Sequence, residues 1–292
     1  MHPLENRDRT SLSVELRRQV QILHRQLDQA AGALTAAVTP TAIHNTRVAA
    51  RRLRVLLHAY EREFDSKEAR RFRRKLKSLA RDLAAARDAD VMRLVIAQVA
   101  RNRRGTIGRN SRALYLRALK RHATALHGLR LTIAAAPWQQ RLRDLRQLAA
   151  LSSLVKGSGA LAATATDRLV KRRRRRLCGA LDRGGWTPKR LHKIRLKVKA
   201  MRYLLEGCLS KSAIGASLEL KRLRQIQGCL GEMHDEENVL KSLCAGLRHV
   251  EAVREVCKKL KTRKGRHIHA FKGHRKALMR IWATQSAIDL GD

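Results

Sequence analysis

Aromatic side chains are scarce in this 292-residue sequence, since Phe, Trp and Tyr together make up only 3% of it. Proteins that bind single-stranded nucleic acids usually stack bases on aromatic rings, so the scarcity weakens that interpretation. The five cysteines are odd in number and include no Cys-x-x-Cys pair, which favours reduced thiols and a cytoplasmic location over a disulfide framework. No run of about 18 apolar residues occurs, so no membrane span is expected. The polar N-terminus does not resemble a signal peptide.

Acidic residues are scarce as well. The chain has 24 Asp and Glu against 65 Lys and Arg, which makes its net charge +41. Like charges held close together repel, so a folded chain with this imbalance is expected to bind a polyanion. DNA, RNA, an anionic membrane surface and an inorganic phosphate polymer all remain open at this point.

The cations gather on one face of a predicted helix that begins at Thr39 and Pro40. Thr39 suits the helix cap, and Pro40 suits the first helical position because the missing N–H has no partner there. The apolar residues of the opposite face, such as Leu53 and Leu57, are expected in the core. We name the cationic face the first stripe. It consists of His44, Arg47, Arg51 and Arg54, with His58 one turn further. No acid occurs between residues 44 and 59. A solvated face normally mixes charges of both signs, so external anions are expected here.

The same pattern recurs 148 residues later, because Thr187 and Pro188 repeat Thr39 and Pro40 (188 − 40 = 148). The second stripe consists of His192, Arg195, Lys199 and Arg202. With only 4 prolines and 12 histidines in the chain, a Pro and a His matched at one offset indicate an internal duplication. Successive cations lie roughly 5 Å apart along a helix axis, which suits a linear polyanion.

Helical periodicity continues along the chain, and no strand pattern is found. The first half predicts helices over 12–38, 41–64, 67–100 and 109–135, and the second half over 137–156, 160–181, 188–209, 216–247 and 248–284. The helix at 67–100 is expected to be interrupted near Arg87, with Asp88 capping its continuation. The predicted fold class is all-α, with two tandem antiparallel four-helix bundles related by internal duplication. Their boundaries are 11–136 and 137–285, after a flexible leader at 1–10.

Other polar motifs are weaker. His234-Asp235 resembles a metal-binding pair, but its counterpart in the first half is Arg87-Asp88, so a metal is not predicted there. The six cations of 171–176 are distributed around a helix and are interpreted as a general anion attractor. The histidines at 267, 269 and 274 are expected to be solvated. Carboxylates that could hold Mg²⁺ are absent near the stripes in sequence, so no catalytic residue, cofactor or metal site is predicted.

These motifs resemble the CHAD family, the conserved-histidine α-helical domain. The resemblance rests on the His-x-x-Arg pattern from His44 to Arg54, on the segment from Leu76 to Val91, and on the second copy from His192 to Arg202. It covers residues 10 to 284. The sequence departs from the family pattern at Lys199 and in the gapped segment before His234.

The resemblance implies non-catalytic binding of inorganic polyphosphate in a basic groove between two helical bundles, with a role at polyphosphate granules. The residues implied in this binding are His44, Arg47, Arg51, Arg54, Lys75, His192, Arg195, Lys199, Arg202 and Arg222. The alternative is a nucleic-acid binding protein driven by net positive charge alone. An enzyme acting on polyphosphate is the third hypothesis, and the scarcity of carboxylates argues against it.

Overall fold

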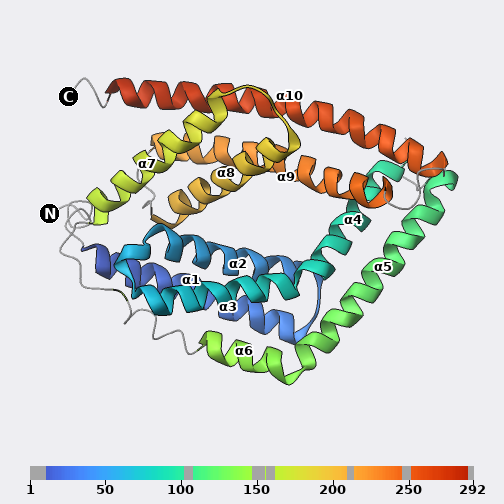
Figure 1. Cartoon of the computed structure of the whole chain (residues 1–292), viewed down its shortest axis with the longest axis horizontal. Coiled ribbons are helices and arrows are strands. Elements are labelled where there is room, and N and C mark those ends of the chain that lie inside the picture. Colours follow the sequence, from blue (N-terminus) through green and yellow to red (C-terminus); the bar gives the residue numbers. More distant parts are fainter. Residues whose placement is uncertain are drawn as a thin grey trace. The chain divides into compact units, whose positions relative to one another are not determined.

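The structure is a computed structural model that describes residues 11–101, 108–146, 155, 162–208, 214–244 and 251–288. Within these ranges the chain is all-α, as predicted (Figure 1). The helices are α1 (Leu12–Ala36), α2 (Pro40–Ala59), the 3-10 turn η1 (Glu61–Glu63), α3 (Ser66–Asp82), α4 (Ala84–Ala100), α5 (Arg109–Ala134), α6 (Ala136–Arg146), α7 (Ala162–Asp182), α8 (Pro188–Cys208), α9 (Ile214–Cys244) and α10 (Glu251–Ile288). Phe64 and Val155 form an isolated antiparallel bridge.

The predicted helix start at Thr39 and Pro40 is confirmed. The Thr39 hydroxyl accepts a hydrogen bond from the Ala42 N–H at 3.1 Å, and Pro40 is the first residue of α2. The Asp65 carboxylate caps α3 by accepting from the N–H groups of Lys67 and Glu68. The predicted helix of 137–156 is wrong at Val155, which forms an extended bridge instead of a helical turn. Residues 147–154 of that prediction, and the break at 157–159, lie outside the described residues.

The interruption predicted near Arg87 is wrong in position. The break comes at Leu83, between α3 and α4, and Asp88 lies inside α4 instead of capping it. The Arg47 guanidinium donates to the carbonyl of Ala80 at 2.6 Å. This carbonyl is one of the last four of α3, which have no partner within the helix. A side chain from α2 thus stabilises the end of α3, which the linear sequence does not reveal.

The chain divides into two compact units, each built from separate stretches. Unit 1 comprises Met1–Asp90 and His122–Arg172, and unit 2 comprises Val91–Arg121 and Arg173–Asp292. Unit 1 therefore contains residues from both predicted repeats, and so does unit 2. The repeat boundaries and the internal duplication stay predictions.

In unit 1, helices α1, α2, α3 and α6 pack around an apolar core. The fully buried side chains include Leu16, Leu53, Leu57, Leu76 and Trp138. Leu53 and Leu57 lie on the face of α2 opposite the first stripe, as the periodicity predicted. Burying each such side chain is worth about 1.5–3 kcal/mol, so this core determines which face of α2 meets solvent.

In unit 2, α9 packs against both α8 and α10, and α4 and α5 add a further apolar cluster. Ile96, Leu114, Val239 and Leu260 are buried together in that cluster. The cysteines Cys178, Cys229 and Cys257 are half-buried and are not in disulfides. None of the helices in the described ranges has the length and apolar character to cross a bilayer.

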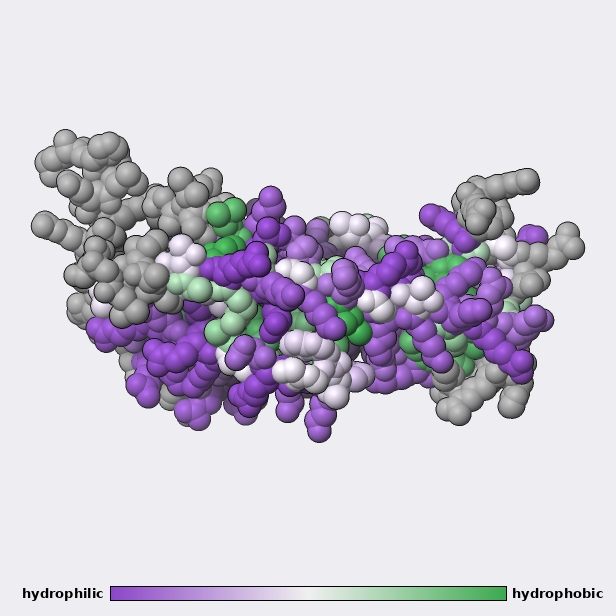
Figure 2. Space-filling model, turned by 90° about the horizontal axis from the view of Figure 1, so that it is seen from above, coloured by the Kyte–Doolittle hydropathy of each residue, from purple (hydrophilic) through white to green (hydrophobic). Residues whose placement is uncertain are grey.

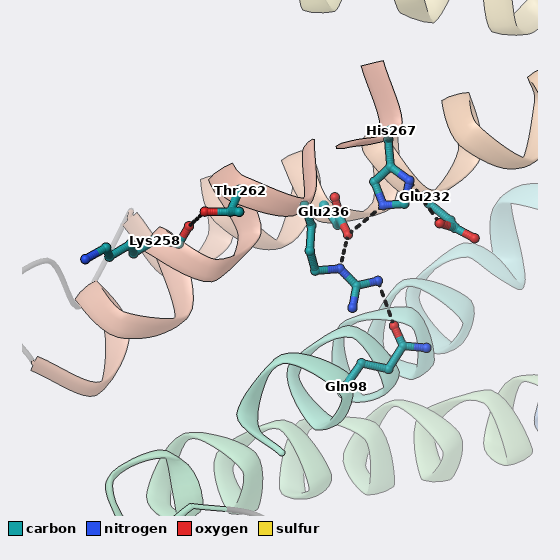
Figure 3. A network of polar contacts seen from close by, with 7 residues as sticks. Gln98, Glu232, Glu236, Lys258, Thr262 and His267 are labelled. Carbon is teal, nitrogen blue, oxygen red and sulfur yellow. Dashed lines mark hydrogen bonds and ion pairs between the residues drawn. The ribbon is translucent and has the colours of Figure 1, made fainter. Parts of the chain in front are cut away.

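A polar network lies beside this cluster (Figure 3). Glu236, only 1% exposed, accepts from Arg263 Nε at 2.7 Å, and the same guanidinium donates to Gln98 at 3.2 Å. The two ring nitrogens of His267 lie 3.2 Å from carboxylate oxygens of Glu232 and Glu236. The expectation that His267 is merely solvated is therefore wrong, because α9 supplies it with two acidic partners.

A second buried carboxylate, Glu219, joins α9 to α7 and α10. It accepts from Arg174 at 2.8 Å and from the Trp282 indole N–H at 2.9 Å, and it is 1% exposed. Arg174 belongs to the six-cation run, so one member of that run is internal and neutralised. Removing one partner of such a pair leaves an uncompensated buried charge.

We expect Glu219→Gln to lower the free energy of unfolding by about 3 kcal/mol, because Arg174 then has no counter-charge. Urea titration followed by far-ultraviolet circular dichroism measures this change. Glu15→Gln, which breaks the exposed pair with Arg18, is the control and should cost under about 1 kcal/mol. Equal effects of the two substitutions would contradict a structural role for Glu219.

Candidate anion-binding site

The two stripes lie on α2 and α8, one in each unit, and each is described within its own unit. On α2, His44 is exposed, while Arg47, Arg51 and Arg54 are half-buried. On α8, all four members of the second stripe are half-buried. In both helices the opposite face is packed in the core, with Ile194 and Val198 buried on α8.

Arg51 is the central charge of the first stripe. Burial lowers the pKa of His44, and Arg87, Arg51 and Arg47 lower it further, with Asp90 opposing them. Burial and then Arg51 also lower the pKa of Arg47. The guanidinium of Arg54 is affected in the same way, by burial, Arg51 and Arg73. These groups destabilise one another's charged forms, so an anion bound among them would relieve the repulsion.

Neighbouring helices add charges that the sequence pattern did not assign to the site. Arg87 on α4 faces His44 and Arg47, and Arg73 on α3 faces Arg54. The fold also brings acids close, because Asp88 raises the pKa of Arg47. Asp90 is 1% exposed and forms an ion pair with Arg87 at 2.8 Å. The first stripe is therefore free of acids along α2, but not in its tertiary surroundings.

The second stripe has a histidine partner on α9. The ring centroids of His192 and His234 are 5.1 Å apart. Burial, Arg195, His192, Lys199 and Lys241 together lower the pKa of His234 to about 4, so this ring is neutral at pH 7. The pKa of His192 is lowered by burial, Arg195 and Lys199. A neutral imidazole can approach these cations without adding charge to them.

The position of His234 corresponds to that of Arg87 at the offset of 147 found in this segment (234 − 87 = 147). Both residues face the histidine of a stripe, Arg87 beside His44 and His234 beside His192. His234 was set aside at the sequence level because its counterpart is an arginine. The matching position could have identified His234 as a site residue, because a residue at that position in either copy is expected to lie beside the histidine of the stripe.

The remaining predicted residues have partners of their own. Arg202 lies 3.6 Å from Glu206 and stacks over the ring of Tyr203. Lys75 donates to Asp144 on α6 at 2.6 Å, which holds the pKa of that carboxyl below its ordinary value. Their part in the site stays a prediction.

Arg222, on α9, donates to Gln225 at 3.0 Å. It also faces His274 of α10, whose pKa is lowered by burial and by Arg222. Its binding role likewise stays a prediction.

Chemically, each stripe offers forked guanidinium donors and imidazole N–H groups along one helix edge. One guanidinium group can donate two parallel hydrogen bonds to two oxygens of a phosphate, and lysine adds a mobile point charge. Among the described residues, no group of three or more His, Cys, Asp or Glu side chains is positioned to hold a metal ion. The arrangement is suited to binding the oxygens of an extended anion.

Comparison with known proteins identifies the family of this chain. The family model described as CHAD domain matches residues 21–243. Comparison with curated proteins gave no match. Among solved structures, the CHAD domain from the plant Ricinus communis is similar, with a TM-score of 0.72, 19% identity and 93% of each chain covered. PptA from Streptomyces chartreusis has a TM-score of 0.67 and 15% identity, over 94% of this chain and 100% of that one. At these identities, the two structures support the fold.

We expect acid to destabilise the protein partly through His234. The unfolded ring has a pKa near the ordinary 6.5 and the folded ring about 4, so the unfolded state binds more protons between these values. Stability from this group is complete above pH 6.5 and is lost as the pH falls toward 4. The loss is on the order of 2 kcal/mol after allowance for partial solvation.

Urea unfolding of the wild type and of His234→Gln at a series of pH values measures this contribution. Every carboxylate is common to the two proteins, so the difference between their pH profiles isolates His234. Parallel profiles from pH 7 to pH 4 would contradict the neutral, cation-surrounded ring.

Proposed function

The chain belongs to the CHAD domain family, and from this premise we propose that it binds inorganic polyphosphate without catalysing its turnover. Membership of the family supports polyphosphate-related binding in general. The observation that carries the proposal for this chain is the cluster of like charges around Arg51, where burial and then repulsion between neighbouring cations lower the pKa values of His44, Arg47 and Arg54. A bound polyanion would offset that repulsion.

The spacing within each stripe supports a linear ligand. Residues three or four apart on a helix lie roughly 5 Å apart along its axis, so each stripe presents a row of donors instead of a closed pocket. Polyphosphate is an unbranched chain with a negative charge on every phosphate unit, so its charges can lie along the row of donors in a stripe. The row also lacks aromatic rings on which nucleic-acid bases could stack.

The finer parts of the proposal rest on the family resemblance alone. They are that one polyphosphate chain contacts both stripes in a shared groove, and that binding serves delivery to polyphosphate granules. The absence of catalysis belongs to the proposal as well. Release of phosphate from polyphosphate in the presence of Mg²⁺ or Mn²⁺, abolished by changing His44 or His192, would overturn that part.

We expect Arg51→Glu combined with Lys199→Glu to weaken binding of long-chain polyphosphate roughly 100-fold or more. Each reversal removes a charge-assisted phosphate contact worth about 1.5–3 kcal/mol and adds repulsion. Isothermal titration calorimetry at fixed salt measures the affinity, and circular dichroism verifies the helical content.

The matched control is Lys67→Glu combined with Arg74→Glu. These side chains are exposed on α3, so the control reverses one Lys and one Arg and changes the net charge equally. If both double variants lose affinity to the same degree, binding depends on net charge and the stripe assignment fails. If duplex DNA displaces polyphosphate at equal phosphate concentration, the nucleic-acid alternative is favoured.

We expect polyphosphate affinity to increase as the pH falls from 7.5 to 5.5. The pKa values of His44 and His192 are lowered from 6.5 by burial and by neighbouring cations, so both rings are largely neutral in the free protein at pH 7.5. Bound phosphates favour the charged imidazolium and raise both pKa values, so acid strengthens the complex. Calorimetric titrations across this range should show a flatter dependence for His44→Asn combined with His192→Asn. An unchanged dependence would exclude both histidines from the bound surface.

A further inference from the structure

The outer face of α10 carries a row of cations outside both stripes. We name it the α10 ladder. It consists of Lys258, Lys261, Arg266, His269, Lys272, Lys276 and Arg280. Every member is exposed, and the spacings of three to five residues keep them on one side of the helix. The row spans roughly 33 Å at 1.5 Å per residue.

The rest of α10 is engaged with the protein. Val256, Leu260, Phe271, Leu278 and Trp282 are buried on the opposite face. The cations on the flanks of the helix have partners within unit 2. Arg263 and Lys264 contact Glu236 and Glu237, and Arg275 donates to the carbonyl of Leu181. The α10 ladder is therefore the set of cations that packing leaves directed at solvent.

The α10 ladder has no acids to neutralise it. Between Val256 and Ile288 the helix contains neither Asp nor Glu, and no side-chain ion pair joins a member of the ladder to the described residues. Some exposed cations on other helices do have acidic neighbours. Arg18 pairs with Glu15 on α1, and Arg71 pairs with Glu68 on α3. Like charges at these spacings destabilise a helix, so the uniform sign of the ladder favours an external anion.

The composition of this face restricts the class of anion. Small or polar residues lie between the cations, namely Thr262, Gly265 and Gly273, all exposed. Insertion into a lipid surface requires large apolar side chains, and single-stranded nucleic acids require stacking rings, and this row has neither. In the space-filling view of Figure 2, most of the visible described surface is hydrophilic.

We propose that the α10 ladder is a second contact surface for long-chain polyphosphate. It rests on the proposed function and extends it to a surface beyond the stripes. A single row of cations, one helix wide, matches a ligand that is one chain wide, whereas a nucleic-acid duplex presents two phosphate strands on either side of a groove. A chain long enough to contact a stripe and the ladder gains avidity that a short chain does not.

The test compares Lys272→Glu combined with Arg280→Glu against the wild type and against the α3 control, Lys67→Glu with Arg74→Glu. Calorimetry measures binding of long-chain polyphosphate and of tripolyphosphate at several salt concentrations. We expect the ladder variant to bind the long chain about tenfold more weakly, with tripolyphosphate affinity unchanged. The slope of log affinity against log salt should fall by about two, one unit for each phosphate contact removed.

Each other outcome has a definite meaning. If the wild type binds long-chain polyphosphate and the ladder variant matches the α3 control, the ladder proposal is overturned and the proposed function stands. If the wild type does not bind polyphosphate, both are overturned. If the ladder variant instead loses affinity for duplex DNA, with polyphosphate binding intact, the surface belongs to nucleic acid and the proposal is wrong.

Discussion

The buried carboxylates of this protein are each held by cations, and much of the tertiary structure depends on these ion pairs. In the described part of the chain, Asp90, Glu219 and Glu236 are each 1% exposed, and each lies against an arginine. A buried carboxylate without such a partner would be strongly destabilising. In a chain with 24 acids and 65 Lys and Arg residues, acids used in the interior are not available to neutralise the surface. The cation row on α2 and the α10 ladder are consequently left without acids in their own stretches of helix, whereas on α8 Arg202 pairs with Glu206.

The rows differ in how strongly the protein constrains them. The stripe arginines are half-buried, and Arg47 is fixed by its hydrogen bond to the end of α3. Such groups lose little further freedom when they bind a phosphate, so they favour affinity and defined geometry. The α10 ladder is exposed and consists mainly of lysines, which supply attraction with less geometric constraint. Two classes of surface on one protein would let it capture a long anion and hold part of it firmly.

The predicted helix of residues 188–209 and the predicted stripe faces were confirmed because they depend on local rules. A threonine cap, a proline at the first turn and an apolar stripe on the opposite face act within a few residues of one another. The break at Leu83 could not be predicted in the same way, because Arg47 stabilises it from another helix. His267 was misinterpreted for the same reason, since its partners Glu232 and Glu236 lie on α9.

The sequence by itself determined the fold class, the charge, and the side of α2 and α8 on which the cations lie, because all three follow from composition and a period of 3.6 residues. Only the tertiary structure decided which charges surround each stripe. It placed Arg87 beside His44 and His234 beside His192. Interactions between charges depend on distance through space, and residues far apart in sequence acquire that distance only when helices pack.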